Sequence, residues 1–318
     1  MLSYECKIYI AGHRGMVGTA CWQALETAGY VNLIGKTSKE LDLRNQAEVE
    51  NFISKEKPDA IVDAAARVGG ILANDSYPYE FLMDNMLIQN NLIRSAYKND
   101  VSKFVFLGSS CIYPKLATQP IKEEYLLTDS LEPTNEWYAI AKISGVKLIE
   151  ALRKQFKKDY VALMPTNLYG PNDNFDLATS HVLPAMIRKF HEAKVASAES
   201  VTLWGSGMPK REFLHVSDLG RAVLHALQNS MSSSLYNVGT GLDISIKDLA
   251  DKIASSVGFS GNIDWDISKP DGTPRKLLDV SRLKDQGWQS EVDLDDGIEA
   301  TYNWFLKNSA SLREVKMT

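Results

Sequence analysis

Three side chains in the middle of the chain, Ser109, Tyr138 and Lys142, are of types that can reduce a carbonyl group together. Tyr138 and Lys142 stand four residues apart, so on a helix they share one face. A free phenol titrates near about 10. A neighbouring ammonium favours the phenolate and lowers that pKa, which helps the phenol to protonate an oxyanion as a hydride arrives. Ser109 would offer a second hydroxyl to the same oxygen.

Three glycines near the N-terminus, Gly12, Gly15 and Gly18, could hold the dinucleotide that such a reduction needs. They follow an apolar strand-like segment, residues 7–11, and open an apolar helical one. A turn of this kind lets the backbone approach a pyrophosphate, and the first N–H groups of the helix attract anions. The spacing of these glycines departs from G-x-G-x-x-G, so the prediction of a dinucleotide site depends on the strand and the helix that flank them. A glycine-rich turn without a ligand is the alternative.

The end of the second predicted strand indicates which nicotinamide cofactor would bind. An NAD enzyme usually places a carboxylate there for the ribose hydroxyls. Here residues 36–39 are basic and hydroxylated, and the first carboxylate is Glu40. Lys36, Lys39 and Arg14 would attract a 2′-phosphate, so the sequence predicts NADP rather than NAD. Solvated surface charges are the alternative interpretation.

Short β-branched strands alternate with helical stretches through the first half of the chain. The strands are nearly continuous apolar runs, as in parallel sheets that helices cover on both faces. This pattern predicts an α/β fold, a Rossmann-type doubly wound parallel sheet. We expect strands at 7–11, 31–35, 60–64, 103–107 and 160–164, and helices at 15–28, 46–55, 78–99 and 138–156.

After Pro165 the alternation becomes irregular, which predicts a smaller mixed α/β lobe. We expect an NADP-binding domain over residues 1–170 and a substrate-binding lobe over 171–318, with 213–230 able to pack back on the first domain. The expected elements of the second half are a loop at 171–174, helices at about 181–193, 219–227 and 245–257, a turn at 205–207 and a strand at 213–216, with Ser217 or Asp218 as the cap of the helix 219–227.

Several longer blocks, together with the motifs above, resemble the extended short-chain dehydrogenase/reductase superfamily, in its branch that acts on GDP-linked 4-keto-6-deoxymannose. The resemblance runs from residue 7 to about residue 305. It implies an NADPH-dependent enzyme that inverts C3 and C5 of this sugar and then reduces C4, with Ser109, Tyr138 and Lys142 at the carbonyl. The blocks are 12–18, 109–114, 132–136, 164–171, 204–207 and 211–215.

Inversion at two carbons needs one group to remove a proton and another to return it, and the resemblance implies Cys111 and His181. Reference pKa values of about 8.5 for Cys and about 6.5 for His bracket neutrality. In an extended segment Cys111 would point to the same side as Ser109. The plainer alternatives are a small buried core residue for Cys111 and a helix cap for His181.

The resemblance also implies contacts for the two ligands. Trp204 suits an aromatic wall and Arg211 a diphosphate, whereas Lys189 and Lys276 could equally be solvated charges. The implied cofactor residues are Gly12, His13, Arg14, Gly15, Met16, Val17, Gly18, Ser38, Lys39, Glu40, Leu41, Asp42, Leu43, Leu107, Gly108, Ser109, Ser110, Tyr138, Lys142, Pro165, Thr166, Asn167, Leu168 and His181; the implied substrate residues are Asn167, Lys189, Trp204, Arg211, Asp271 and Lys276.

Composition excludes several other classes of protein. A net charge of −5 does not suggest a nucleic-acid binder, and no apolar run approaches about 18 residues, so no membrane span is expected. Three cysteines suit a reducing compartment, with the cytoplasm as the default. The sequence has no Cys-x-x-Cys, and we expect no metal site. The family is usually dimeric, which makes the predicted helices 78–99 and 138–156 the expected contact of a homodimer.

Two other interpretations stay open. One is a related sugar-nucleotide 4-epimerase or 4,6-dehydratase. Dehydratases of this kind generally carry an Asp-Glu pair after the serine, whereas Ser110, Cys111 and Ile112 follow Ser109 here, and a simple 4-epimerase needs no Cys/His pair. The other is a non-catalytic NADP-sensing protein, which would be expected to lack Tyr138 or Lys142.

Overall fold

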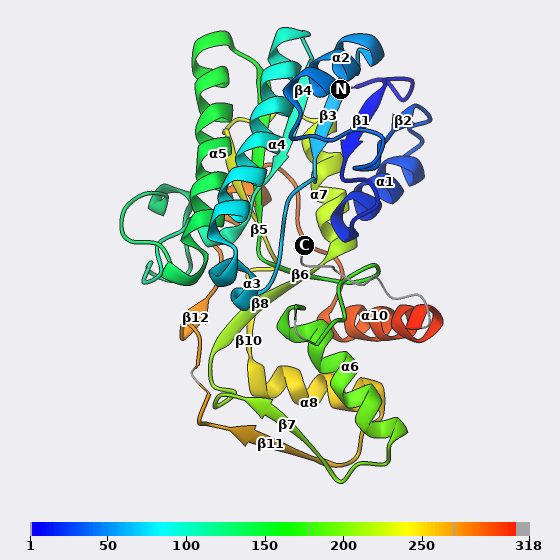
Figure 1. The fold of residues 1–318 in the computed structure, drawn as a ribbon, viewed down its shortest axis with the longest axis vertical. Helices are drawn as coiled ribbons and strands as arrows, with labels where there is room; N and C mark the ends of the chain where they lie inside the picture. Colours follow the sequence, from blue (N-terminus) through cyan, green and yellow to red (C-terminus); the bar gives the residue numbers. More distant parts are fainter. Residues whose placement is uncertain (1, 178, 270, 310–318) are drawn as a thin grey trace.

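A six-stranded parallel sheet lies at the centre of the computed structural model, which describes residues 2–177, 179–269 and 271–309 (Figure 1). The strand order is β2-β1-β3-β4-β5-β9, so the chain reverses direction across the sheet after β2. This confirms the predicted doubly wound fold. The strands are β1 (Ile8–Ala11), β2 (Leu33–Ile34), β3 (Ala60–Asp63), β4 (Lys103–Leu107), β5 (Asp159–Pro165) and β9 (Leu235–Val238).

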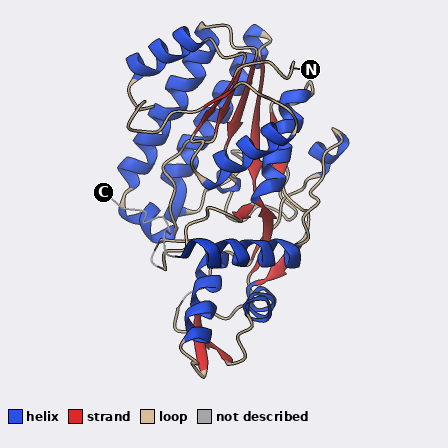
Figure 2. Cartoon of the chain, turned by 90° about the vertical axis from the view of Figure 1, so that its right-hand side faces the viewer, coloured by secondary structure: helices blue, strands red, loops and turns tan. Residues whose placement is uncertain are grey.

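Helices cover both faces of this sheet, which explains why its strands are almost entirely apolar (Figure 2). On one face Val49, Leu92 and Val146 pack against the strand residues Tyr9 and Phe106. The helices of this face are α2 (Gln46–Glu56), α4 (Pro78–Lys98) and α5 (Glu136–Phe156), and those of the other face are α1 (Met16–Thr27), α7 (Val216–Gln228) and α9 (Ser281–Asp285).

The lower half of Figure 1 is a smaller lobe around two short sheets. One sheet has the order β10-β8-β12 with β6 also paired to β8, and the other pairs β11 with β7. Its strands are β6 (Asn167–Tyr169), β7 (Ser200–Trp204), β8 (Lys210–His215), β10 (Asp243–Ser245), β11 (Asn262–Asp266) and β12 (Arg275–Lys276), and its helices are α6 (Val182–Val195), α8 (Ile246–Val257) and α10 (Leu294–Asn308).

Helix α7 joins the two halves, and the prediction of its cap was wrong. The helix begins at Val216, directly after β8, and the side chain of His215 caps it by accepting the Ser217 N–H. Asp218 instead accepts the N–H groups of Glu291 and Val292. An imidazole nitrogen can accept a hydrogen bond as an oxygen does. A prediction that considers only Ser and Asp as helix caps therefore misses His215.

The division into domains at residue 170 stays a prediction. Helix α7 and strand β9 belong to the layers of the six-stranded sheet. Within the predicted lobe, residues 178, 270 and 310–318 lie outside the described residues. A short helix, α3 (Ile71–Ser76), follows β3, and three 3₁₀ turns precede α5. None of the helices formed by the described residues is both long and apolar enough to cross a membrane.

Candidate active site

The glycine turn between β1 and α1 is packed so closely that a side chain does not fit at two of its three glycines. Gly12 has φ +78°, and a Cβ there would lie 2.8 Å from the Ala64 carbonyl oxygen. A Cβ on Gly18 would lie 2.1 Å from the Gly12 oxygen, whereas one on Gly15 would meet nothing closer than 3.4 Å. Because α1 has no side-chain cap, its first N–H groups are available. This backbone cradle fits the pyrophosphate of a dinucleotide.

Glu40, the first carboxylate after β2, forms hydrogen bonds within its own loop. Glu40 accepts hydrogen bonds from the Thr37 N–H (2.9 Å) and hydroxyl (2.7 Å), and it lies 3.6 Å from the Lys36 ammonium. The Thr37 hydrogen bonds, helped by Lys36, lower the pKa of Glu40 to about 2. Lys36 is therefore partly neutralised. Arg14 and Lys39 are both exposed and remain the cations of this end of the site.

Helix α5 and the end of β4 bring the predicted catalytic side chains together. Lys142 is buried, and its ammonium donates to the Leu107 carbonyl at 2.9 Å. The same nitrogen lies 4.7 Å from the centre of the Phe106 ring and 5.8 Å from that of Tyr138. Ser109 follows β4 and opens a 3₁₀ turn that contains Cys111.

In the protein without a cofactor, the Lys142 ammonium does not lower the pKa of Tyr138 as predicted. Burial raises the pKa of Tyr138 far above its ordinary value, and the charges of Cys111 and Asp63 raise it further. Burial also lowers the pKa of Lys142. The Lys142 ammonium donates to a backbone carbonyl and lies 5.8 Å from the centre of the phenol ring, so it does not offset this desolvation. Tyr138 therefore carries a firmly held proton.

Cys111 lies beside Ser109, but not for the predicted reason. The segment is not extended, since Ser110–Ile112 forms the 3₁₀ turn and the Cys111 N–H donates to the Ser109 hydroxyl oxygen at 3.4 Å. A serine cap favours a turn over an extended strand here. Burial raises the pKa of the Cys111 thiol, while the charge of Lys276 and the Ser109 hydroxyl oppose that rise.

His181 stands at the cap position of α6 with an exposed side chain. Its side chain makes no hydrogen bond to the first turn of the helix, so the alternative that His181 serves as a helix cap is wrong. Surrounding protein lowers the pKa of His181, which favours the neutral imidazole at neutral pH. The backbone of Thr179 and Ser180, just before it, packs against Gly70 in the segment after β3. This contact holds His181 at the junction of the two halves.

The predicted GDP contacts lie around β7, β8 and β12. Trp204 ends β7 with a 70% exposed ring. The ammonium groups of Lys189 and Lys269 lie 5.8 and 5.5 Å from the centre of that ring. Asp271 accepts the Ser206 N–H (2.9 Å) and hydroxyl (2.6 Å), so it is anchored to the turn after Trp204. The sequence interpretation missed Lys269, which lies in a loop without any motif.

Two further substrate candidates, Arg211 and Lys276, are direct neighbours on the paired strands β8 and β12. Asn167 uses its amide to bond the Glu212 carbonyl at 2.8 Å, which ties β6 to β8. Because the charge of Lys276 acts on the Cys111 thiol, this lysine lies nearer the reacting end of the site than its sequence role suggested. Asp63, a second functional candidate that the sequence interpretation missed, is a single charge at the end of an apolar strand.

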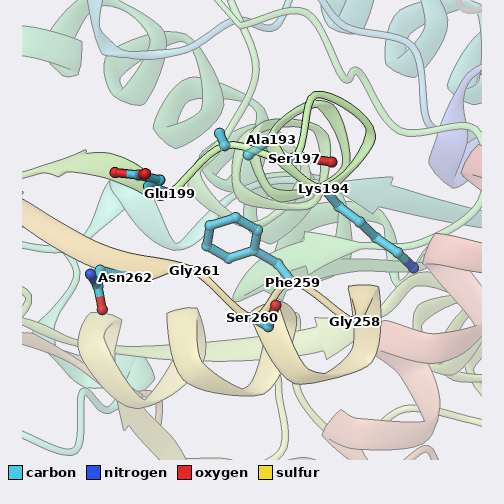
Figure 3. A pocket seen from close by; sticks show the side chains of 10 residues that line it. Ala193, Lys194, Ser197, Glu199, Gly258, Phe259, Ser260, Gly261 and Asn262 are labelled. Carbon is cyan, nitrogen blue, oxygen red and sulfur yellow. The ribbon is translucent and has the colours of Figure 1, made fainter.

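A hollow of about 550 Å³ lies elsewhere, at the outer end of the smaller lobe (Figure 3). Lys194, Glu199, Phe259 and Asn262 line it, between the end of α6 and the start of β11. None of the predicted site residues is among its lining residues. We therefore place the candidate active site at the carboxyl ends of the central strands and not in this hollow.

Comparison with known proteins agrees with this geometry. The GDP-L-fucose synthase 1 of Arabidopsis thaliana is 54% identical over 308 residues, 97% of this chain and 95% of that protein. The GDP-L-fucose synthase of Escherichia coli (strain K12) is 52% identical over 316 residues, 96% of this chain and 98% of that protein. The structure of a GDP-L-fucose synthetase from Naegleria fowleri bound to NADP superposes with a TM-score of 0.90 at 28% identity, covering 99% and 96% of the two chains.

Residues 8–239 match the NAD dependent epimerase/dehydratase family. Together with the glycine cradle, this match indicates that the cofactor is a nicotinamide dinucleotide. The chain belongs to the NAD dependent epimerase/dehydratase family, in which its relatives at about half identity are GDP-L-fucose synthases.

Proposed function

We propose that the protein converts GDP-4-keto-6-deoxy-D-mannose to GDP-L-fucose, by inverting C3 and C5 and then reducing C4 with NADPH. The observation that carries the proposal is the Cys111 thiol beside Ser109, Tyr138 and Lys142. A reductase or a simple 4-epimerase needs only the last three. The thiol adds an acid–base group where the carbons next to the carbonyl would lie.

In the epimerisation, the Ser109 and Tyr138 hydroxyls donate hydrogen bonds to the C4 carbonyl oxygen. Charge drawn onto that oxygen makes the hydrogens on C3 and C5 more acidic and stabilises the enediolate. Cys111 and His181 then exchange protons with each carbon from opposite faces of the ring. The neutral imidazole is ready to take a proton, and the neutral thiol is ready to return one.

In the reduction, bound NADPH supplies a hydride to C4. Tyr138 gives its phenolic proton to the C4 oxygen as that oxygen becomes an alkoxide, a base strong enough to take a firmly held proton. The nearby Lys142 ammonium balances the charge that is left on the phenol. Trp204, Lys189 and Arg211 hold the GDP end of the substrate.

A spectrophotometric assay tests this function. Addition of GDP-4-keto-6-deoxymannose should remove one equivalent of NADPH absorbance for each sugar reduced, and solvent deuterium should enter C3 and C5. A 4-epimerase would consume no net NADPH. A 4,6-dehydratase would act on the GDP-hexose that precedes this keto sugar, and an NADP-sensing protein would bind the cofactor without turning it over.

We further propose NADP as the cofactor, on the charges of Arg14 and Lys39. Glu40 faces its own loop, so it offers less repulsion to a 2′-phosphate. The variant Arg14→Ala is expected to raise the KM for NADPH about tenfold, because one charge-assisted contact is lost, and to leave the KM for NADH nearly unchanged. Lys55→Ala, an exposed cation on α2, is the control. Equal losses with both cofactors would contradict a phosphate contact.

A homodimer through α4 and α5 also belongs to the proposal. Apolar residues spaced four apart along α4, among them Met83 and Leu87, are exposed, and so are Ile140 and Leu148 on α5. Such neighbouring apolar stripes suit a two-fold helical interface. Sedimentation should show that Leu148→Glu turns the dimer into a monomer, whereas Val31→Glu, at another exposed apolar position, should not. If Leu148→Glu stays dimeric, the interface lies elsewhere.

The proposed compartment is the cytoplasm. The mechanism needs Cys111 as a free thiol, and none of the three cysteines forms a disulfide. A reducing compartment keeps such a thiol available.

A further inference from the structure

A buried carboxylate lies beneath the catalytic lysine. Asp63 ends β3 with no exposed surface, and it is paired in register with Ala11 on β1 and Phe106 on β4. Paired residues of parallel strands direct their side chains to the same face of the sheet. Ala11 and Phe106 belong to the core under α4 and α5, so Asp63 also faces α5, the helix that carries Lys142.

Three polar groups of this region have unused hydrogen-bonding capacity. The Oδ1 atom of Asp63 accepts one N–H, that of Ala65 at 3.3 Å, and its Oδ2 atom has no partner among the described residues. The buried hydroxyl of Tyr9, two residues before Ala11 on the same face, also lacks one there. The Lys142 ammonium has three donors, and its nitrogen lies over Phe106, the strand neighbour of Asp63.

We infer that Asp63 is a positioning residue, the internal counter-charge that keeps Lys142 an ammonium beneath Tyr138, with the Tyr9 hydroxyl as a second support of the same carboxylate. A buried ammonium held only by a neutral carbonyl is costly, and one carboxylate on the adjacent strand balances it. The pairing of Asp63 with Lys142 does not depend on the proposed function, whereas its effect on the reaction does, because that effect requires Lys142 to act in catalysis.

The charges around this pair agree with the inference. Burial raises the pKa of Asp63 to about 6, and Lys142 opposes that rise. Burial lowers the pKa of Lys142, and the charges of Asp63 and Cys111 oppose that fall. Burial and the charge of Asp63 raise the pKa of Tyr9, so its hydroxyl stays a donor. Asp63 is ionised above about pH 6, where Lys142 needs it.

The pH dependence of kcat tests the role in the reaction. In Asp63→Asn the alkaline limb should move down by about one pH unit, because Lys142 loses the charge that supports its ammonium, and the acidic limb near pH 6 should disappear. The isotope effect with NADPH deuterated at C4 should rise, since hydride transfer is the slowed step. A profile and isotope effect equal to those of the wild type would overturn the role.

Two phenol variants sharpen this test. Tyr9→Phe removes the hydroxyl that we infer supports the carboxylate, and it should move the acidic limb to higher pH. Tyr160→Phe is the matched control, since Tyr160 is an equally buried phenol on the same face whose hydroxyl donates to the Val101 carbonyl. Equal shifts in both variants would assign the effect to a general loss of packing.

Thermal unfolding tests the pairing without any assay of activity. Asp63→Asn and Lys142→Met each leave one buried charge without its partner, so each should lower the Tm. The double variant should unfold at least about 2 °C above either single variant. This comparison remains informative if Asp63→Asn alone is too unstable to assay. Losses that simply add would overturn the pairing. Coupled losses in a protein that does not consume NADPH would keep the pairing and reject only the proposed reaction.

Discussion

The variant Tyr138→Phe is expected to lower kcat about a thousandfold and to change the Kd for NADPH by less than about twofold. In the proposed mechanism the phenol gives a proton to the C4 oxygen, and a general acid contributes about 10²- to 10⁴-fold. The ring, which packs edge-on against Phe81 at 6.4 Å between centres, is kept in the variant. Single-turnover measurement of NADPH absorbance would separate hydride transfer from binding.

Tyr97→Phe is the matched control for this variant. Its ring packs against Phe156 where α4 and α5 end, whereas Tyr138 lies in the first turn of α5. The control should keep full activity. If Tyr138→Phe keeps more than about a tenth of the wild-type kcat, another group protonates the C4 oxygen and the proposed role of the phenol is wrong.

The variant Cys111→Ser is expected to slow the entry of solvent deuterium into C3 and C5 by at least about a hundredfold, with NADPH binding intact. Serine keeps the size and the turn, but its hydroxyl exchanges protons with carbon far less readily than a thiol. Mass spectrometry of the recovered keto sugar, without NADPH turnover, measures the exchange by itself. Cys6→Ser, a partly exposed cysteine before β1, is the control.

An unchanged exchange rate in Cys111→Ser would remove the thiol from the mechanism. Loss of exchange at only one of the two carbons would show instead that Cys111 serves that carbon and that His181 serves the other. Either result leaves the reduction to Tyr138 and Lys142, so the two variants test separate halves of the reaction.

The central sheet could be predicted because its strands are buried on both faces. Residues such as Ile8 and Val105 leave no polar alternation, and the helices between them are amphipathic. The location of the candidate site followed from the same logic, since the glycine turn and Ser109 stand at the carboxyl ends of β1 and β4, two strands of one parallel sheet with β3 between them. The second strand was overestimated because Val31 is β-branched yet 81% exposed, so its side chain packs against little.

Other parts depend on contacts distant in sequence. Strand β9 is only four residues long, and it holds the buried Asn237, whose amide donates to the carbonyls of Ile121 and Asp279. No sequence pattern near residue 237 predicts these two hydrogen-bond acceptors. Helix α10 did leave a signal, since Ile298, Tyr302 and Phe305 recur at helical spacing after the cap Asp293, but the segment is otherwise polar.

The electrostatic state of the site was the least predictable part. Spacing placed Lys142 near Tyr138, but it could not show that burial would raise the pKa of the phenol. Nor could it indicate that Asp63 would share the same interior. Such effects are sums over everything that surrounds a group, so they appear only when the whole chain is folded.

The direct passage from β8 into α7 bears on how a new nucleotide preference could arise in this scaffold. Strand β8 carries Arg211, and α7 starts at the residue after β8 ends. The strand with the proposed nucleotide contact Arg211 is therefore joined directly to a helix that packs on the six-stranded sheet. Exchanging the loops around Trp204 should therefore change which nucleotide is accepted without altering the path of the hydride.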